Sequence, residues 1–96
     1  MSIYAVAQLS IHDRDLYSQY EAGFGEIFAR YGGEMIAVDD APEVLEGDET
    51  YSRCVIMRFP DRESLMAWYR SGDYQALAAI RWRASTGTAV AIRARD

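Results

Sequence analysis

The stretch RCVIMRFPDRESLMAWYRSGDYQALAAIRWR, residues 53–83, decides the fold of this chain. Its first seven residues, 53–59, are mostly apolar and predict a strand that ends at a Phe-Pro step. Asp61 follows as a helix cap, and the Ser-Gly-Asp triplet at 71–73 breaks this helix and begins a second one. The stretch therefore predicts a strand and then one broken helix over roughly residues 61–84.

Another strand and helix precede this stretch. Residues 3–11 alternate as a strand does, and Asp13 offers a cap for the helix that follows. Gly32-Gly33 ends that helix, because glycine readily adopts the left-handed conformation of a C-terminal cap. Apolar residues recur along one arc of this helix: Leu16, Tyr17, Tyr20, Phe24, Ile27, Phe28 and Tyr31.

Residues 34–38 and 86–94 predict two further strands. The segment before residue 53 is predicted to be a hairpin connection, either a plain loop or one with a minor strand around Val44–Leu45. The resulting order is strand, helix, strand, strand, helix, strand. It predicts one α+β domain over residues 1–96, with a ferredoxin-like βαββαβ fold, a four-stranded antiparallel sheet and both helices on one face.

Both faces of the predicted sheet are apolar. In the strand of the opening stretch, Val55 and Met57 on one face are matched by Ile56 on the other. A sheet face in water would carry polar residues at alternate positions. We therefore expect a homodimer that covers the open sheet face with a second copy of the chain, sheet against sheet.

Composition excludes several classes of protein. The net charge of −5 argues against a nucleic-acid-binding surface, and no apolar run approaches the roughly 20 residues of a membrane span. The sequence lacks a secretory-signal pattern, which predicts a cytoplasmic protein. With one histidine, one cysteine and no lysine, we expect no metal site, no cofactor and no Schiff-base chemistry.

Five segments together resemble the domain-of-unknown-function 1330 family (DUF1330): YAVAQLSIHDRDLYSQY, RYGGEMIAV, APEVLEGD, RCVIMRFPDRESLMAWYRSGDYQ and AIRWRAS. The resemblance covers residues 3–92 and implies the fold of the dimeric α+β barrel proteins. These proteins include cofactor-free monooxygenases, isomerases of small ring lactones and haem-handling enzymes, so the resemblance implies fold rather than reaction. The chain departs from the family at Arg58, where relatives more often carry an acidic residue.

Arg81 is the first candidate for a ligand contact. It falls on the inward stripe of the broken helix, where a guanidinium needs a partner. That partner is either a carboxylate of the protein or the anionic group of a small ligand. Tyr17, Trp68 and Tyr74, with Tyr20, either fill the core or line a cleft for a flat organic ligand.

Other polar residues are weaker candidates. Gln8, Ser10 and Arg58 interrupt apolar strand positions and either are satisfied within the dimer or point into a pocket. His12, beside Asp13, forms either a surface turn or a base for proton transfer.

Gly23 lies at the rim of the apolar arc of the first helix. It either leaves space for a ligand or permits close packing against a neighbouring helix.

Three functions remain open from the sequence. The first is a homodimer that binds a small aromatic or anionic metabolite, with the ligand-binding residues Arg81, Tyr74, Trp68, Tyr17, Gln8 and Arg58. The second is a cofactor-independent enzyme, like a monooxygenase or an isomerase, with His12 and Tyr17 as its catalytic candidates. The third is a structural dimerisation module, which requires a filled core without a cavity.

Overall fold

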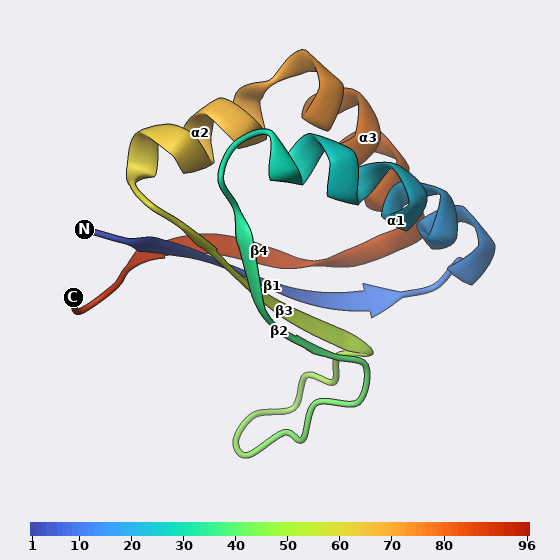
Figure 1. Ribbon diagram of the computed structural model, residues 1–96. Helices are drawn as coiled ribbons and strands as arrows, with labels where there is room; N and C mark the ends of the chain where they lie inside the picture. Colours follow the sequence, from blue (N-terminus) through green and yellow to red (C-terminus); the bar gives the residue numbers. More distant parts are fainter.

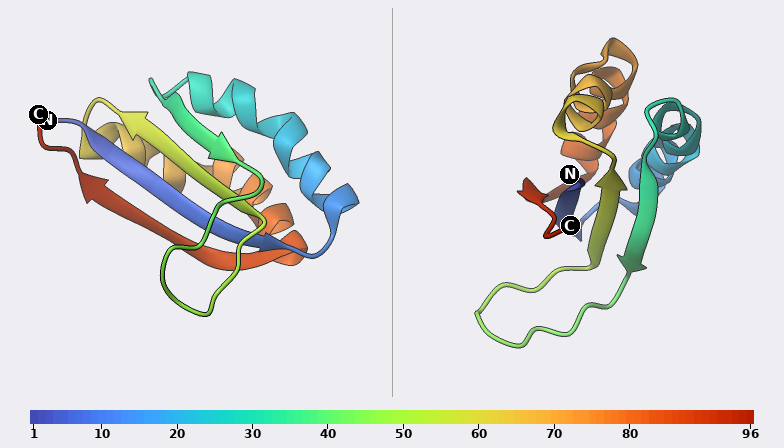
Figure 2. Two further views of the ribbon diagram at one scale, coloured as in Figure 1. Left: turned by 90° about the horizontal axis from the view of Figure 1, so that it is seen from below. Right: turned by 60° about the vertical axis from the view of Figure 1, so that its left-hand side comes forward.

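A computed structural model describes residues 1–96, and its elements follow the predicted order (Figure 1). Three helices cover one face of a four-stranded sheet and leave the other face bare (Figures 1 and 2). None of the three helices combines the length and the hydrophobicity that a membrane span requires. The elements are β1 (Ile3–Ile11), α1 (Arg14–Ala29), β2 (Glu34–Asp39), β3 (Arg53–Phe59), α2 (Arg62–Arg70), α3 (Gly72–Ala84) and β4 (Ser85–Arg93).

The sheet has the strand order β2-β3-β1-β4, and neighbouring strands are antiparallel. In the central strand β1, Leu9 lies opposite Arg53 on one side and opposite Gly87 on the other. Because β1 and β4 are paired along their whole length, the two termini lie side by side (Figure 2). There the backbone N–H of Ser2 donates a hydrogen bond to Asp96 Oδ1 at 3.1 Å.

The predicted caps at Asp13 and Asp61 are confirmed. Asp13 accepts a hydrogen bond from the backbone N–H of Leu16 at 3.0 Å, and Asp61 accepts one from that of Ser64 at 2.7 Å. The Ser64 donor lowers the pKa of the Asp61 carboxyl below its usual value. Each carboxylate thus satisfies a backbone donor in the first turn that has no partner within its helix.

Ser71 produces the predicted break between α2 and α3. Its backbone is extended, with φ −61° and ψ 145°, so it ends one helix and begins the next. Its hydroxyl donates to the Trp68 carbonyl at 2.9 Å and accepts from the Tyr74 backbone N–H at 3.1 Å. One side chain therefore caps both the end of α2 and the start of α3. It hydrogen-bonds to the backbone of the two aromatic residues that flank the break.

The alternative of a minor strand around Val44–Leu45 is wrong. The loop between β2 and β3 contains no strand and extends from the sheet on the side away from the helices (Figure 1). Both edges of β3 are already paired, to β1 and to β2, so the loop has no free edge of β3 to join. Its several carboxylates and Pro42 also disfavour a strand.

An aromatic cluster forms the core where α1, α2 and β3 meet. The ring centroids of Phe28 and Phe59 are 5.5 Å apart, and the Trp68 ring lies 5.2 Å from that of Phe59 and 5.9 Å from that of Phe28. Phe59 is fully buried. These edge-on and tilted contacts hold the two helices to one end of the sheet.

The open face of the sheet exposes apolar side chains. Val90 and Ile92 of β4 are 55% and 48% exposed, and they lie beside Val6 and Tyr4 of β1. Ile56 of β3 continues this surface on the other side of β1. A single chain therefore leaves exposed the second apolar face of the sheet, which the sequence predicted.

Gly87 allows β4 to approach β1 closely. A Cβ atom at this position would collide with the Gln8 carbonyl oxygen and lie 3.0 Å from the Leu9 Cα. Because β1 is paired on both sides, it cannot shift without disturbing the sheet. We expect Gly87→Ala to lower the free energy of unfolding by about 2–3 kcal/mol, measured by urea denaturation.

Gly25→Ala is the matched control for this prediction. Gly25 lies within α1, and a Cβ atom there would meet nothing within 4 Å. Since alanine favours a helix interior over glycine, the change should raise the free energy of unfolding by up to about 1 kcal/mol. Unchanged stability of the Gly87 variant would contradict the close approach of β1 and β4.

Candidate functional site

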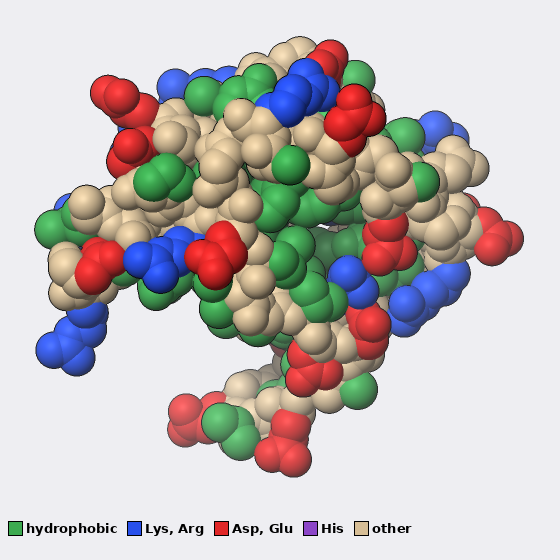
Figure 3. Space-filling view, in the orientation of Figure 1, with side chains coloured by type: hydrophobic (Ala, Val, Ile, Leu, Met, Phe, Trp, Pro, Cys, Tyr) green, Lys and Arg blue, Asp and Glu red, His purple; other side chains and the backbone are tan.

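A cavity of about 360 Å³ lies between the helices and the sheet. In the space-filling view a hollow lined by hydrophobic side chains opens between the two layers (Figure 3). Strands β1, β3 and β4, with Met35 of β2, form its floor, and all three helices contribute to its walls. The lining is almost entirely hydrophobic, with Arg53, Arg81 and Glu21 as the charged members.

Small residues on the floor create this space. Ala5 and Ala7 of β1 lie opposite Ala91 and Ala89 of β4, and all four alanines line the cavity. Alanine side chains reach only a short distance above the sheet. The space between them and the helices is therefore wide, and the side chains of the helices do not fill it. The alternating alanines of residues 5–7 and 89–91 were the sequence signal for this cavity, and the sequence-based prediction did not use it.

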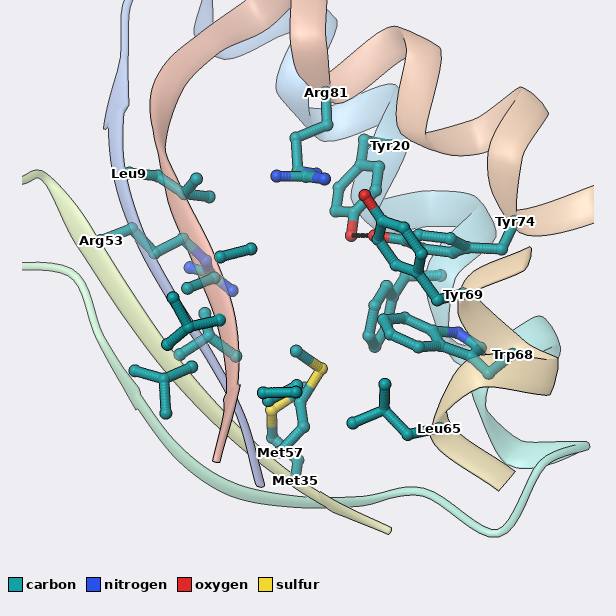
Figure 4. Close-up of a pocket in the computed structure, with 18 of the residues that line it drawn as sticks. Leu9, Tyr20, Met35, Arg53, Met57, Leu65, Trp68, Tyr69, Tyr74 and Arg81 are labelled. Atoms are coloured by element: carbon teal, nitrogen blue, oxygen red, sulfur yellow. Dashed lines mark hydrogen bonds between the residues drawn. The ribbon is translucent and has the colours of Figure 1, made fainter. Parts of the chain in front are cut away.

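Arg81 of α3 points into the cavity and is 9% exposed (Figure 4). Its Nε is buried without a hydrogen-bond partner, and none of the four ion pairs of the chain includes it. Its guanidinium lies over the Tyr20 ring, with Cζ 5.9 Å from the centroid. Burial raises the pKa of the Tyr74 hydroxyl, and the guanidinium lies close enough to offset part of this rise. A buried cation without a carboxylate partner is costly, so this position favours an anion supplied from outside.

Tyr20 and Tyr74 form a hydroxyl pair on the helix side of the cavity. Their oxygens are 2.8 Å apart, and both side chains are buried (Figure 4). The Tyr74 ring packs on that of Trp68, with centroids 4.1 Å apart. The Trp68 Nε1 is buried without a partner. This wall therefore offers flat aromatic surfaces with a few polar groups, as ligand pockets usually do.

Arg53 is the second cation of the cavity wall, and it is already paired. It forms ion pairs with Asp40, at 2.6 Å, and with Glu21, at 3.2 Å. Its guanidinium also lies over the Tyr17 ring, with Cζ 5.7 Å from the centroid. The two arginines thus differ: protein carboxylates neutralise Arg53, whereas Arg81 has none.

Burial raises the pKa of the Tyr17, Tyr20 and Tyr74 hydroxyls. Below about pH 10 these groups are neutral in the folded and the unfolded chain alike. Above this pH the unfolded chain loses the protons while the folded chain keeps them, so the free energy of unfolding falls as the pH rises. These hydroxyls therefore remain protonated at neutral pH.

An alkaline titration tests whether these three tyrosines stay protonated in the folded chain. We expect the three tyrosines to ionise only as the chain unfolds, so tyrosinate absorbance and circular dichroism should change together at high pH for these residues. The Tyr20→Phe and Tyr74→Phe variants should lose the corresponding part of the late absorbance change. Ionisation of all seven tyrosines before any loss of ellipticity would contradict the burial.

The structure brings together four of the six residues predicted to bind a ligand. Arg81, Tyr74, Trp68 and Tyr17 all line the cavity. Their role in binding stays a prediction. Tyr20, which the sequence offered with the other aromatic residues as part of a cleft wall, also lines the cavity. Sequence-based prediction missed other members of the wall: Leu9, Met35, Arg53, Met57, Leu65 and Tyr69.

Gln8 and Arg58 lie elsewhere, because they occupy even-numbered strand positions that face the open side of the sheet. These two residues therefore do not line the cavity with Arg81, and their role in ligand binding stays a prediction. Arg58 donates hydrogen bonds to Ser2 Oγ at 3.0 and 3.2 Å and forms an ion pair with Asp96 at 3.4 Å. It thus has partners in its own chain.

His12 lies in the turn between β1 and α1 and is exposed. Its backbone N–H donates to the Ala84 carbonyl at 3.0 Å, so the residue fixes the turn through its main chain. His12 is not part of the cavity wall. Nowhere does the chain bring three histidine, cysteine or acidic side chains together as metal ligands.

The comparisons with known proteins agree with this fold. A family model described as Domain of unknown function (DUF1330) matches residues 2–94. The structure is similar to RPA0582, a protein of unknown function from Rhodopseudomonas palustris, with a TM-score of 0.84 and 16% identity over 99% of this chain and 83% of that one. No curated protein matches the chain.

Two further structures extend the comparison. A dimeric ferredoxin-like protein of unknown function from Jannaschia sp. CCS1 has a TM-score of 0.76 and 13% identity, over 98% of this chain and all of that one. SnoaB, a cofactor-independent oxygenase from Streptomyces nogalater, has a TM-score of 0.65 and 17% identity, over 99% and 94%. At these identities the likeness shows the ferredoxin-like fold, and the predicted fold class is confirmed.

Proposed function

The chain belongs to the DUF1330 family, and from this starting point we propose that it is a homodimer that binds a small aromatic or anionic metabolite between its helices and its sheet. The observation that carries the proposal is the cavity of about 360 Å³ with the unpaired Arg81 in its wall. Its volume falls within the range of roughly 300–1,000 Å³ that is typical of small-molecule sites.

The open sheet face supports the homodimer. Ile56, Val90 and Ile92 form an apolar surface that a single chain leaves in water. A second copy of the chain would bury this surface, sheet against sheet. The Jannaschia protein of the same fold is dimeric, which favours this arrangement.

Binding without catalysis is favoured over a cofactor-independent enzyme. The hydroxyls of Tyr17, Tyr20 and Tyr74 have raised pKa values and therefore act as hydrogen-bond donors rather than as bases. The carboxylate on the cavity wall, Glu21, is held by Arg53. The fold of the oxygenase SnoaB keeps the enzyme as the second candidate, with Tyr20 and Tyr74 as proton donors to a substrate oxygen.

A structural dimerisation module is the least supported of the three functions. Such a module needs a core that is filled by its own side chains. The cavity is instead kept open by the alanines of β1 and β4. The space is therefore better explained by a ligand than by packing.

Ala5→Phe tests the binding site. Ala5 lies on the cavity floor, and a phenyl ring there would occupy the space of a ligand. Two-ring aromatic compounds, neutral and acidic, should raise the melting temperature of the wild type by several degrees at concentrations far above Kd. The variant should show no such shift, as measured by differential scanning fluorimetry.

Ala67→Phe is the matched control. Ala67 is exposed on α2 and is not part of the cavity wall, so this variant should respond to the compounds as the wild type does. If no compound shifted the wild type, or if Ala5→Phe kept the full shift, the proposed site would be wrong.

A further inference from the structure

The positions of the charged and apolar groups in the cavity specify a ligand more narrowly. We infer that the ligand is an amphipathic monoanion: an apolar body of about two rings with one carboxylate or similar acid, held with its acid at Arg81 and its body toward Met57 and Leu65. This inference rests on the proposed function, since it assumes that the cavity binds a small molecule.

The strand register separates the two ends of the cavity. Leu9 lies opposite Arg53 and Gly87, and Ala5 lies opposite Met57. These two β1 positions are four residues apart, which is about 13 Å along a strand. In the close-up, Arg81 lies near the Leu9 end, and Met35, Met57 and Leu65 gather at the other (Figure 4).

Arg81 is the cation at the polar end that forms no ion pair. It is more than nine-tenths buried, its Nε has no hydrogen-bond acceptor, and no carboxylate lies within ion-pair distance. A planar guanidinium of this kind binds a carboxylate through two parallel hydrogen bonds. The Arg53 Nε is also buried without a partner, but Asp40 and Glu21 already neutralise this guanidinium, so it attracts a further anion less than Arg81 does.

The apolar end has no partner for a second charge. Met35, Met57 and Leu65 meet there, and their side chains contain no hydrogen-bond donor for an anion. A carboxylate buried among them would lose its hydration without compensation. The cavity therefore favours one acid group over two.

The cavity volume sets the size of the apolar body. A cavity of roughly 150 Å³ is large enough to bind one benzene ring. The present cavity, at about 360 Å³, is more than twice as large. A fused two-ring body with one acid is therefore a suitable probe, and its rings can pack against those of Trp68 and Tyr74.

Isothermal titration calorimetry with three matched probes tests the inference on the wild-type protein. The probes are 2-naphthoate, its neutral isostere 2-naphthamide, and naphthalene-2,6-dicarboxylate. We expect 2-naphthoate to bind about 10- to 100-fold more tightly than 2-naphthamide, because a hydrogen bond to a charged group contributes a free energy of this size. The dicarboxylate should bind at least about tenfold more weakly than 2-naphthoate, because its second acid would be buried among apolar groups.

The Arg81→Met variant tests whether Arg81 causes the preference for the acid over the amide. The variant should bind 2-naphthoate no better than 2-naphthamide, while Arg83→Met, at an exposed position of the same helix, should keep the wild-type preference. Arg81→Lys retains the charge and should retain part of the preference. If Arg81→Met does not fold, the Lys variant and the three-probe comparison on the wild type still decide the matter.

The outcomes separate this inference from the proposed function. Equal affinity of the acid and the amide, or an undiminished affinity of the dicarboxylate, would overturn the monoanion inference and leave the binding site in place. Failure of all three probes to bind would overturn both. Retention of the acid preference in Arg81→Met would show that another group holds the anion.

Discussion

Replacing Trp68 with alanine is expected to lower the free energy of unfolding by about 3–5 kcal/mol. Trp68 is 2% exposed, and its ring packs against Phe59, Tyr74 and three further aromatic rings. Its removal would separate α2 from both β3 and α1. Because small domains are stable by only about 5–15 kcal/mol, the variant should be close to unfolding at 37 °C.

Trp82→Ala is the control for this prediction, since Trp82 is 52% exposed on α3. Its free energy of unfolding should change by no more than about 0.5 kcal/mol. Urea denaturation followed by circular dichroism measures both variants. A loss below about 1 kcal/mol for Trp68→Ala would contradict the aromatic cluster as the centre of the core.

Ile92→Asp is expected to convert the proposed homodimer into a monomer. Ile92 is 48% exposed on the open sheet face, where the second copy would cover it. A carboxylate buried in that interface, once on each copy, would be desolvated without a partner, which costs several kcal/mol. The dimer dissociation constant should therefore rise by about a thousandfold or more.

Light scattering and sedimentation at micromolar concentration measure this change. The matched control is Ala79→Asp, which places the same charge at an exposed position of α3 on the opposite side of the molecule. It should remain dimeric. A monomeric wild type would contradict the homodimer, and a dimeric Ile92→Asp variant would place the interface on another surface.

Sequence predicted the elements well because their signals are local. A cap such as Asp61 acts on a backbone donor only three residues away, and Ser71 breaks the helix through contacts with Trp68 and Tyr74. The apolar arc of α1 required only its own periodicity. Such features do not depend on which strands pair.

The cavity could not be predicted in the same way, since it depends on the register. Ala5 and Ala91 become neighbours only when β1 pairs with β4, and they leave a gap only because helices lie above them. The position of Gln8 and Arg58 away from the cavity depends on the sheet in the same way. Strand alternation places both side chains on one face of the sheet. Their polarity alone did not show whether this is the face under the helices or the open face.

Gly23 illustrates a choice that sequence left open. Its two interpretations were space for a ligand and close packing against a neighbouring helix. A Cβ atom there would lie 2.8 Å from Leu77 Cδ1 of α3, so the structure supports close packing of α1 on α3. The cavity lies instead between the helices and the sheet.

A crystal structure of the protein with 2-naphthoate tests most directly whether the cavity is a binding site. We expect the carboxylate within hydrogen-bond distance of the Arg81 guanidinium, and the naphthalene ring between the Trp68–Tyr74 wall and the alanines of β1 and β4. Crystals in which the cavity contains only solvent at saturating 2-naphthoate, or in which side chains have closed it, would contradict this site.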